Sequence, residues 1–528
     1  MTITGETRSF WTCVLLVSVV KLLMLKSYRS TDFEVHRNWL AITHSLPLEK
    51  WYYESTSEWT LDYPPLFAYF EWILSYGALV FDPKMLDVQN LNYASPMTIL
   101  YQKLTVIVTD VILAYGVLEC SKVMSLIIPK TGTNPKSNYA TELFGLIFIN
   151  GGLFMVDHIH FQYNGFLFGI LMLSIARISK GKCFQGAFLF ASLLSLKHIF
   201  LYIAPAIGIY LLRTCCITTD RRGVPRAINR SSVRLWGIVG SVAAVAFGPF
   251  YKHIPQILQR LFPFKRGLSH AYWAPNIWAG YNSLDLILGY GLRLGKSGAT
   301  SGLVGESSLA VLPQVQPIHS FLITAVAMLP ILWTLWRNPS PTSFIYAVTL
   351  TAWTSFMFGY HVHEKAILNV IIPFSLIALL NQNLFFLTLV AGTVSLFPLL
   401  FTPFEIVLKA VLTVFHASVA SQIVKPKLNW YQTLYILGFL PVYIFENLGD
   451  ALIPKLPFLP LLLVSDYTFL GIGICYLSLY WKFVTNQEQT VTTKKSLTPR
   501  EKSTPQIQPD NVRVLRQRST KNLQYTNK

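Results

Sequence analysis

The sequence predicts an all-α membrane protein that crosses the bilayer roughly fourteen times. Hydrophobic residues make up 52% of the 528 residues and charged residues only 13%, which is too apolar for a soluble protein of this length. Apolar runs of about 15 to 25 residues recur along the chain, and each can cross or nearly cross the hydrocarbon core. They must be helical, because lipid offers the backbone no other hydrogen-bond partners.

The predicted spans follow one another from the first residues to about residue 482. They are centred on 10–26, 100–119, 140–157, 161–179, 183–196, 199–213, 234–252, 318–337, 343–359, 366–380, 384–400, 404–424, 430–448 and 458–482. We interpret 1–482 as one transmembrane domain. The remaining residues, 483–528, are polar, basic and proline-bearing, and they predict a disordered tail.

The distribution of Arg and Lys predicts the orientation. The loop after the sixth span carries a cluster of arginines (Arg213, Arg221, Arg222, Arg226, Arg230 and Arg234), so it should be cytosolic. Counting spans places both termini in the cytosol and two long loops, 27–99 and 253–317, on the far side. The net charge of +18 then mostly reflects the membrane topology of the chain. The basic segments should also contact anionic membrane lipids. The tail lacks the aromatic platforms of nucleic-acid-binding proteins, so no nucleic-acid partner is expected.

The first far-side loop is unusually acidic for this chain. Six carboxylates fall within its residues 32–62, interleaved with Trp and Tyr side chains (Asp32, Glu34, Glu49, Glu54, Glu58 and Asp62). Ionised carboxylates are too costly to bury in hydrocarbon, so the loop should be a folded, water-facing segment. Acids beside aromatic faces could bind a sugar and activate a hydroxyl group. The structural alternative is an aromatic interfacial belt with solvated acids.

Four further polar groups fall on the same face by the count of spans. They lie in Asp157–Gly165, at Lys197 and His198, in Arg260–Ala279, and in His361–Lys365. Their cations, Arg260, Lys265, Arg266, His363 and Lys365, would form a patch at membrane depth that suits a lipid-linked phosphate. The stretch from Arg260 to Arg266 could instead be a snorkelling membrane exit.

A metal site is not expected. His158 and His160, like His361 and His363, are two residues apart, which does not place both imidazoles on one helix face. A zinc-protease motif beginning at His363 would need a second histidine where Ile367 stands. No glycine-rich loop of the nucleotide-binding type is present either. No cofactor is therefore predicted, and a lipid-phosphate sugar is a better donor than a nucleotide sugar.

Five ordered blocks give the chain a specific resemblance: STDFEVHRNW, LDYPP, HFQYNG, RLFPFKRG and HVHEKAIL. Together, between about Thr31 and Phe401, they resemble the endoplasmic-reticulum glucosyltransferases of GT-C architecture that use dolichyl-phosphate glucose (glycosyltransferase family 57). HFQYNGFLFG and SHAYWAPNIWA are more similar to the member that adds the second glucose than to the one that adds the first. The resemblance implies transfer of α-1,3-linked glucose onto Glc1Man9GlcNAc2 on dolichyl pyrophosphate, in the lumen, with amphipathic helices in the lumenal loops. Addition of the first glucose, to Man9GlcNAc2, is the alternative.

The resemblance also implies an inverting reaction with one carboxylate base. The family's base is an acidic residue soon after the first helix, which matches Asp32, and Asp62 in LDYPP is the rival. The leaving phosphate departs as an anion held by cations, so no general acid is needed. The expected acceptor-binding or orienting residues are Glu34, His36, Arg37, Trp59, His158 and Gln162. A transporter or flippase of lipid-linked sugars is the competing class, but it would place its charges at broken helices near the bilayer midplane.

Overall fold

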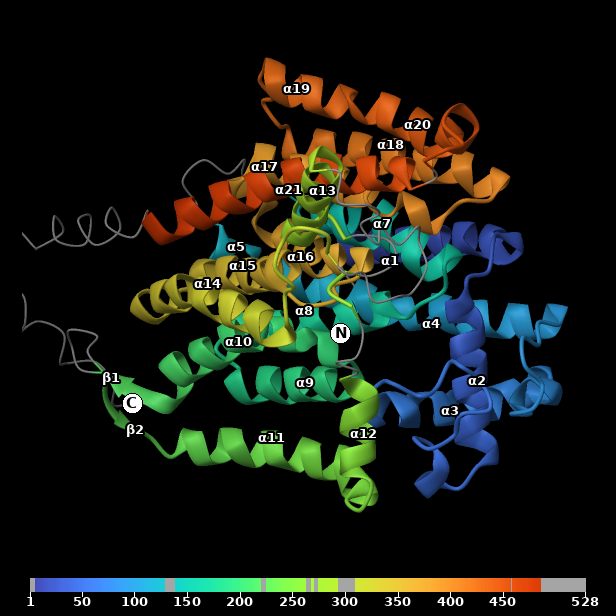
Figure 1. Cartoon of the computed structure of the whole chain (residues 1–528). Helices are drawn as coiled ribbons and strands as arrows, with labels where there is room; N and C mark the ends of the chain where they lie inside the picture. Colours follow the sequence, from blue (N-terminus) through green and yellow to red (C-terminus); the bar gives the residue numbers. More distant parts are fainter. Residues whose placement is uncertain are drawn as a thin grey trace, which may run out of the picture. The chain divides into compact units, whose positions relative to one another are not determined.

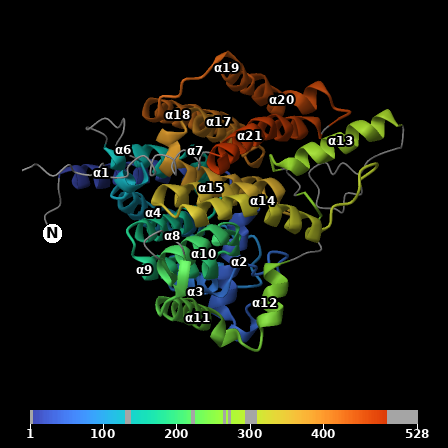
Figure 2. The same ribbon diagram turned by 90° about the vertical axis from the view of Figure 1, so that its left-hand side faces the viewer.

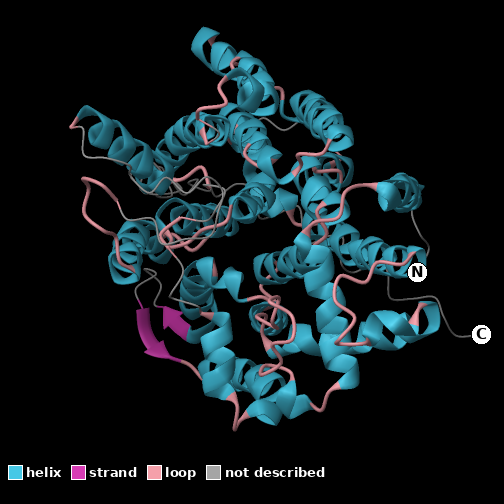
Figure 3. Cartoon of the chain, turned by 45° about the vertical axis from the view of Figure 1, so that its right-hand side comes forward, coloured by secondary structure: helices cyan, strands magenta, loops and turns pink. Residues whose placement is uncertain are grey.

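The computed structural model describes residues 5–128, 138–219, 225–262, 267–269, 274–292, 309–456 and 458–485. Across these residues the chain is almost entirely helical (Figure 1). The strands of the described ranges, β1 (Ile217–Thr219) and β2 (Pro225–Ile228), form one antiparallel ribbon inside the predicted cytosolic loop (Figure 3). The prediction of an all-α fold is confirmed.

The helices divide at this ribbon. Before it lie α1 (Gly5–Leu22), α2 (Thr31–Ser45), α3 (Pro65–Phe81), α4 (Pro96–Ser121), α5 (Met124–Ile127), α6 (Tyr139–Leu143), α7 (Gly151–Phe154), α8 (Asn164–Ser179), α9 (Cys183–Leu196) and α10 (Ala204–Leu211). After it lie α11 (Ser231–Phe247), α12 (Ile254–Leu261), α13 (Ile277–Gly291), α14 (Pro317–Arg337), α15 (Pro341–Phe358), α16 (Leu368–Phe374), α17 (Gln382–Val394), α18 (Pro403–Val424), α19 (Trp430–Leu437), α20 (Phe439–Leu452) and α21 (Leu459–Thr485).

Tighter or wider helical turns join or extend these helices. They are η1 (Leu23–Lys26), η2 (Leu48–Lys50), η3 (Pro83–Leu86), η4 (Phe144–Phe148), η5 (Met155–Ile159), η6 (His198–Tyr202), η7 (Leu212–Cys216), η8 (Gly248–Phe250), η9 (Glu364–Ile367), η10 (Ser375–Leu380) and η11 (Phe397–Leu399). Two of them, η5 and η9, lead directly into the candidate site.

Seven helices of the described ranges are long and apolar enough to cross a membrane. They are Thr7–Lys26, Pro96–Ser121, Ser231–Phe250, Pro317–Arg337, Gln382–Leu399, Pro403–Val424 and Leu459–Thr485. A bent pair, Tyr139–Phe148 with Gly151–Ile159, turns by 45° and would make an eighth span. The chain is therefore a multi-pass membrane protein. Each predicted apolar run coincides with one helix or with consecutive helices, while fourteen crossings stays a prediction.

The acidic loop predicted at 27–99 is largely helical. Its first helix, α2, begins after Ser30, whose hydroxyl accepts a hydrogen bond from the Asp32 amide at 3.1 Å, as an N-cap residue does. Its second helix, α3, begins at Pro65, which suits a first-turn position because no amide hydrogen is needed there. The two helices pack together. Helix α3 is apolar, yet it corresponds to none of the predicted apolar runs, because acidic and aromatic residues precede it.

Helices α4, α8, α9 and α11 pack side by side in that order (Figure 1). Close approach of α4 to α8 depends on Gly169, where a Cβ atom would lie 2.5 Å from the backbone carbon of Ile112. Small residues allow such backbone contact between membrane helices. Helix α8 is thereby held at the depth where its first residues, Asn164 and Gly165, reach the candidate site.

The C-terminal helices lie on the side of this layer away from α11 (Figures 1 and 2). Among them, α19 and α20 lie outside α17, α18 and α21. A buried ion pair joins α18 to α20: Lys409 Nζ lies 2.7 Å from Glu446 Oε1, and the two side chains are 0% and 5% exposed. Removing one partner of such a pair leaves an uncompensated buried charge. The pair therefore fixes the packing of the C-terminal helices.

Candidate active site

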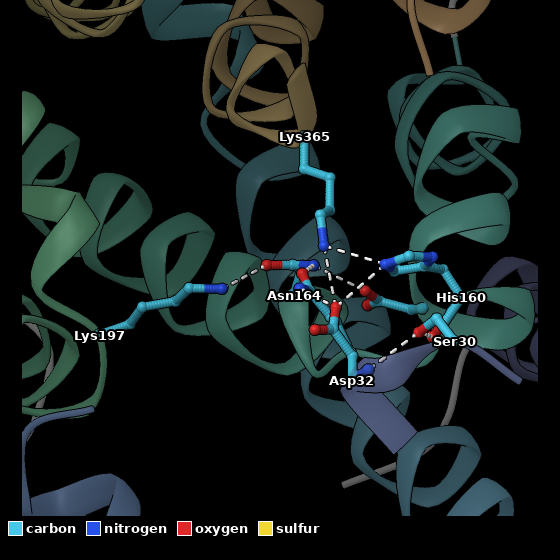
Figure 4. Close-up of polar contacts among 8 residues, drawn as sticks. Ser30, Asp32, His160, Asn164, Lys197 and Lys365 are labelled. Atoms are coloured by element: carbon cyan, nitrogen blue, oxygen red, sulfur yellow. Dashed lines mark hydrogen bonds and ion pairs between the residues drawn. The ribbon is translucent and has the colours of Figure 1, made fainter. Parts of the chain in front are cut away.

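Asp32, in the first turn of α2, is the point at which three distant side chains meet (Figure 4). Its Oδ2 atom lies 2.9 Å from Lys365 Nζ, 3.2 Å from His160 Nε2 and 2.7 Å from Gln162 Nε2. Lys365 comes from η9, whereas His160 and Gln162 come from the connection between η5 and α8. Two predicted site residues, Gln162 and Lys365, thus contact the predicted base directly.

Phe161 allows both of its neighbours to face Asp32. Its φ of 81° is left-handed, a conformation that non-glycine residues rarely adopt and that is often found at functional sites. The Phe161 ring is buried, with its centroid 5.2 Å from that of Phe33 and 5.5 Å from that of His36. This packing holds the turn in place. His160 and Gln162, which would diverge on a helix, therefore reach the same carboxylate oxygen.

A second lysine, Lys197, is connected to the site through Asn164 (Figure 4). Lys197 Nζ donates to Asn164 Oδ1 at 3.0 Å, and Asn164 Nδ2 donates to Gln162 Oε1 and to Asp157 Oδ1, both at 2.8 Å. The ammonium of Lys197 also lies 4.9 Å from the centroid of the Tyr63 ring, a distance typical of cation–π contacts. The candidate site thus contains one central carboxylate and two lysines.

The electrostatic environment keeps Asp32 ionised. Burial alone would raise the pKa of its carboxyl, but the Lys365 ammonium and the hydrogen bond with His160 outweigh burial, and the pKa lies well below its ordinary value. Burial lowers the pKa of Lys197 to about 8, although Asp157, Asp32 and Asp62 favour its charged form. Asp62 therefore lies close enough to influence the same group of charges, and it stays the rival candidate for the base.

A buried ion cluster lies beside the site. Asp110 of α4 accepts from Lys21 at 2.5 Å and pairs with His158 Nε2 at 2.9 Å. A Cβ atom on Gly165 would lie 2.3 Å from Asp110 Oδ1, and the Gly165 amide donates to Asp157 at 2.6 Å. The structure thus places His158 in this cluster and His160, two residues further on, at Asp32. The acceptor-binding or orienting role of His158 stays a prediction.

Three other predicted orienting residues serve to assemble α2 and α3. Arg37 donates twice to Glu34 at 2.8 Å and also to the carbonyl groups of Met85 and Asp87. His36 Nδ1 lies 2.7 Å from Glu71 Oε1, and both side chains are buried. These contacts connect α2 with α3 and with the segment around η3, and an acceptor-binding or orienting role for the three residues stays a prediction.

The remaining predicted residues have different positions. Arg260 donates to Tyr52 O at 3.2 Å and to Thr60 Oγ1 at 3.0 Å, so it binds the first loop. The carbonyl of Trp59 accepts from Asn38 at 3.1 Å. His363 precedes η9 and lies against the ring of His361, with centroids 5.7 Å apart. Lys265 and Arg266 lie outside the described residues.

Sequence reasoning did not identify Asn164 or His160 as site residues. Both stand in the block HFQYNG, which carried the resemblance, and this was the available signal. Within the described ranges, no three His, Cys, Asp or Glu side chains come together as metal ligands would. The groups around Asp32 Oδ2 are an ammonium, an amide and an imidazole, which suit hydrogen bonding to a carboxylate.

Comparison with known proteins identifies the family of the chain. The model of the ALG6, ALG8 glycosyltransferase family matches residues 17–481. A protein of Bos taurus is 46% identical over 506 residues, covering 90% of this chain and 96% of its own length, and a protein of Schizosaccharomyces pombe is 44% identical over 514 residues, covering 91% and 99%. Both are named dolichyl pyrophosphate Glc1Man9GlcNAc2 alpha-1,3-glucosyltransferase.

A Drosophila melanogaster protein, named as a probable enzyme of the same kind, is 47% identical over 480 residues and covers 88% of this chain and 92% of its own length. The family match runs from within α1 to within α21, and it includes every residue of the Asp32 site. This chain belongs to the ALG6, ALG8 glycosyltransferase family.

Proposed function

We propose that this protein transfers glucose from dolichyl-phosphate glucose to Glc1Man9GlcNAc2 on dolichyl pyrophosphate and so adds the second α-1,3-linked glucose. The single observation that carries the proposal is the contact of Asp32 with Lys365, Gln162 and His160, in a chain 44–47% identical to relatives named for this reaction. The site combines a carboxylate that can accept a proton with cations that can hold a phosphate.

The chemistry assigns one role to each part of the site. As the acceptor 3-hydroxyl attacks C1 of the donor glucose, its proton passes to the Asp32 carboxylate. The new O–C1 bond forms while the bond from C1 to the phosphate oxygen breaks, and that oxygen keeps the electron pair. Lys365, together with His363, Lys265 and Arg266, would hold the departing dolichyl phosphate. Preorganised cations stabilise this developing charge without a general acid.

We place the site on the lumenal face of the endoplasmic-reticulum membrane, with both termini in the cytosol. The support is that four segments assigned to one face by counting spans contribute to one site: Asp32, Gln162, Lys197 and Lys365. A site between those segments needs all of them at the same membrane surface. The lipid part of each substrate could then stay in the bilayer while its polar part reaches Asp32.

The test is a transfer assay with purified full-length protein, dolichyl-phosphate glucose, and either Glc1Man9GlcNAc2 or Man9GlcNAc2 on the lipid acceptor. We expect transfer to the monoglucosylated acceptor alone, with the α-1,3 linkage read by exoglycosidase digestion. Transfer to Man9GlcNAc2 instead would favour the first-glucose reaction. Movement of lipid-linked sugar across proteoliposome membranes without any transfer would favour the flippase class.

A further inference from the structure

The hydrogen bonds from Lys197 to Asp32 form a chain with only one possible direction. A lysine ammonium can only donate and an ionised carboxylate can only accept. Lys197 therefore donates to Asn164 Oδ1, which forces the Asn164 amide nitrogen toward Gln162 Oε1. This contact in turn forces the Gln162 amide nitrogen toward Asp32 Oδ2. The chemistry of the two ends thus fixes the orientation of both amides.

Within this series of hydrogen bonds, Asn164 has no amide hydrogen left for another acceptor. Its nitrogen has two hydrogens, and they go to Gln162 Oε1 and to Asp157 Oδ1, each at 2.8 Å. Asp157 is itself held by the Gly165 amide and is 1% exposed. Asn164 is therefore fixed on three sides, and it lies at the start of α8, which packs closely on α4.

We propose that Asn164 is a positioning residue, which orients Gln162 and through it holds the Asp32 carboxylate toward the reacting hydroxyl. This inference rests on the proposed function, because it assigns the base role to Asp32. A rigid second layer of contacts is what keeps a reacting group in productive geometry. In this site the layer also links the carboxylate to a second cation, Lys197.

The same chain must also affect the protonation of Asp32. Lys365 and His160 face the carboxylate directly, and Lys197, Tyr63 and Asp62 act on the same group of charges. A hydrogen bond from Gln162 favours the ionised form of the carboxylate. If Asn164 is lost, Gln162 can rotate and present its oxygen to Asp32. The carboxyl group should then keep its proton to a higher pH.

The experiment compares Asn164→Asp and Asn164→Ala with the wild-type protein and with Asn38→Ala. Asn164→Asp preserves shape and can still accept from Lys197 but cannot donate to Gln162. Asn38 is a buried asparagine of α2 that donates to the Trp59 carbonyl and takes no part in the hydrogen bonds that lead from Lys197 to Asp32. For both Asn164 variants we expect kcat to fall about ten- to a hundred-fold, with KM changed less than about threefold. In the pH profile of kcat, the midpoint of the acidic limb should shift to higher pH by about one unit.

Folded Asn164 variants with the wild-type kcat and acidic limb would overturn the proposal, and so would an equal kcat loss and limb shift in Asn38→Ala. A second measurement does not depend on activity: the infrared carboxyl band of Asp32, identified by its loss in Asp32→Asn, is titrated in each variant. If the wild-type protein transfers no glucose, the proposed function fails, while this titration still tests the chain. The band should appear at a higher pH in the Asn164 variants, and an unchanged titration would refute the inference.

Discussion

The Nζ atom of Lys365 lies 2.9 Å from Oδ2 of Asp32, although the two residues are 333 positions apart in the sequence. While the ammonium is held by the carboxylate, it lowers the pKa of Asp32 and makes that group a weak base. A donor phosphate that binds Lys365 would take over part of this interaction. We therefore expect donor binding to raise the basicity of Asp32, so that one ammonium couples substrate binding to activation of the base.

Replacement of Lys365 tests this coupling. Lys365→Gln should raise the donor KM and lower kcat, because a charge-assisted contact contributes about 1.5–3 kcal/mol, or roughly ten- to a hundred-fold. The acidic limb of kcat/KM, which reports the free enzyme, should also move to higher pH, since Asp32 loses its neighbouring positive charge. Steady-state kinetics at varied donor concentration and pH provide both readouts. Lys122→Gln, at a half-exposed lysine paired with Glu119, is the matched control, and an unchanged donor KM in Lys365→Gln would exclude the phosphate contact.

That Asp32, Gln162 and Lys365 lie at the same membrane face could be predicted, because the distribution of Arg and Lys assigns whole segments to one side of the membrane. Once the arginine-rich loop is assigned to one side, the count of spans places all three residues at the opposite face. The pairing of Glu34 with Arg37 also had a signal, since the two are three residues apart on a helix. We predicted acceptor-binding or orienting roles for both, because charged residues in a water-facing loop resemble binding residues until their partners are known.

The choice between His158 and His160 could not be predicted from their spacing. It depends on the left-handed turn at Phe161 and on Asp110, which lies 48 positions before His158 and pairs with it. A local pattern contains neither the rare backbone conformation nor the distant partner. The role of Asn164 could not be predicted either. Its orientation follows only from three contacts with other residues.

Gly165 should tolerate no side chain. In Gly165→Ala the new Cβ atom would lie 2.3 Å from Asp110 Oδ1 and 3.4 Å from Asp157 Oδ2, and overpacking of this kind costs about 1–3 kcal/mol. We expect a lower apparent melting temperature in detergent, measured by intrinsic fluorescence. Gly240→Ala is the control, because a Cβ atom there meets nothing within 4 Å and alanine is favoured in helices. Equal stability of the two variants would contradict the close packing at Gly165.

Lys197 should make folding stability depend on alkaline pH. Its pKa is about 8 in the folded protein against an ordinary 10.5, so between these values the unfolded chain binds more protons. Stability then rises with pH in that window. The wild-type melting temperature should therefore increase relative to that of Lys197→Met between about pH 8 and 10.5. Lys50→Met, at an exposed lysine of the first loop, should keep the wild-type dependence. A constant difference between wild type and Lys197→Met across this range would contradict the shift.

The orientation can be tested at the sequon formed by Asn229, Arg230 and Ser231. It follows β2 in the arginine-rich loop, where we predict the cytosol, so it should carry no glycan. Glu54→Asn, which creates a sequon with Ser55 and Thr56 in the first long loop, should acquire one. Gel mobility before and after endoglycosidase treatment measures both. A glycan removed by Asn229→Gln would reverse the proposed topology.

Asp32→Asn separates chemistry from folding, because it keeps the size of the side chain and removes the proton acceptor. Loss of a general base lowers the rate by a factor of about 10²–10⁴, while donor and acceptor binding should persist. Asp62→Asn is the matched control in the same loop: if Asp62 only orders LDYPP or binds the acceptor, it should keep more activity. The comparison uses equally abundant, membrane-inserted proteins with similar melting temperatures, since a misfolded loop would imitate a lost base. If Asp32→Asn turns over near the wild-type rate and Asp62→Asn is inactive, the base is Asp62. The contacts of Lys365 and Gln162 with Asp32 would then serve to bind the phosphate and shape the site, while the inverting reaction would stand.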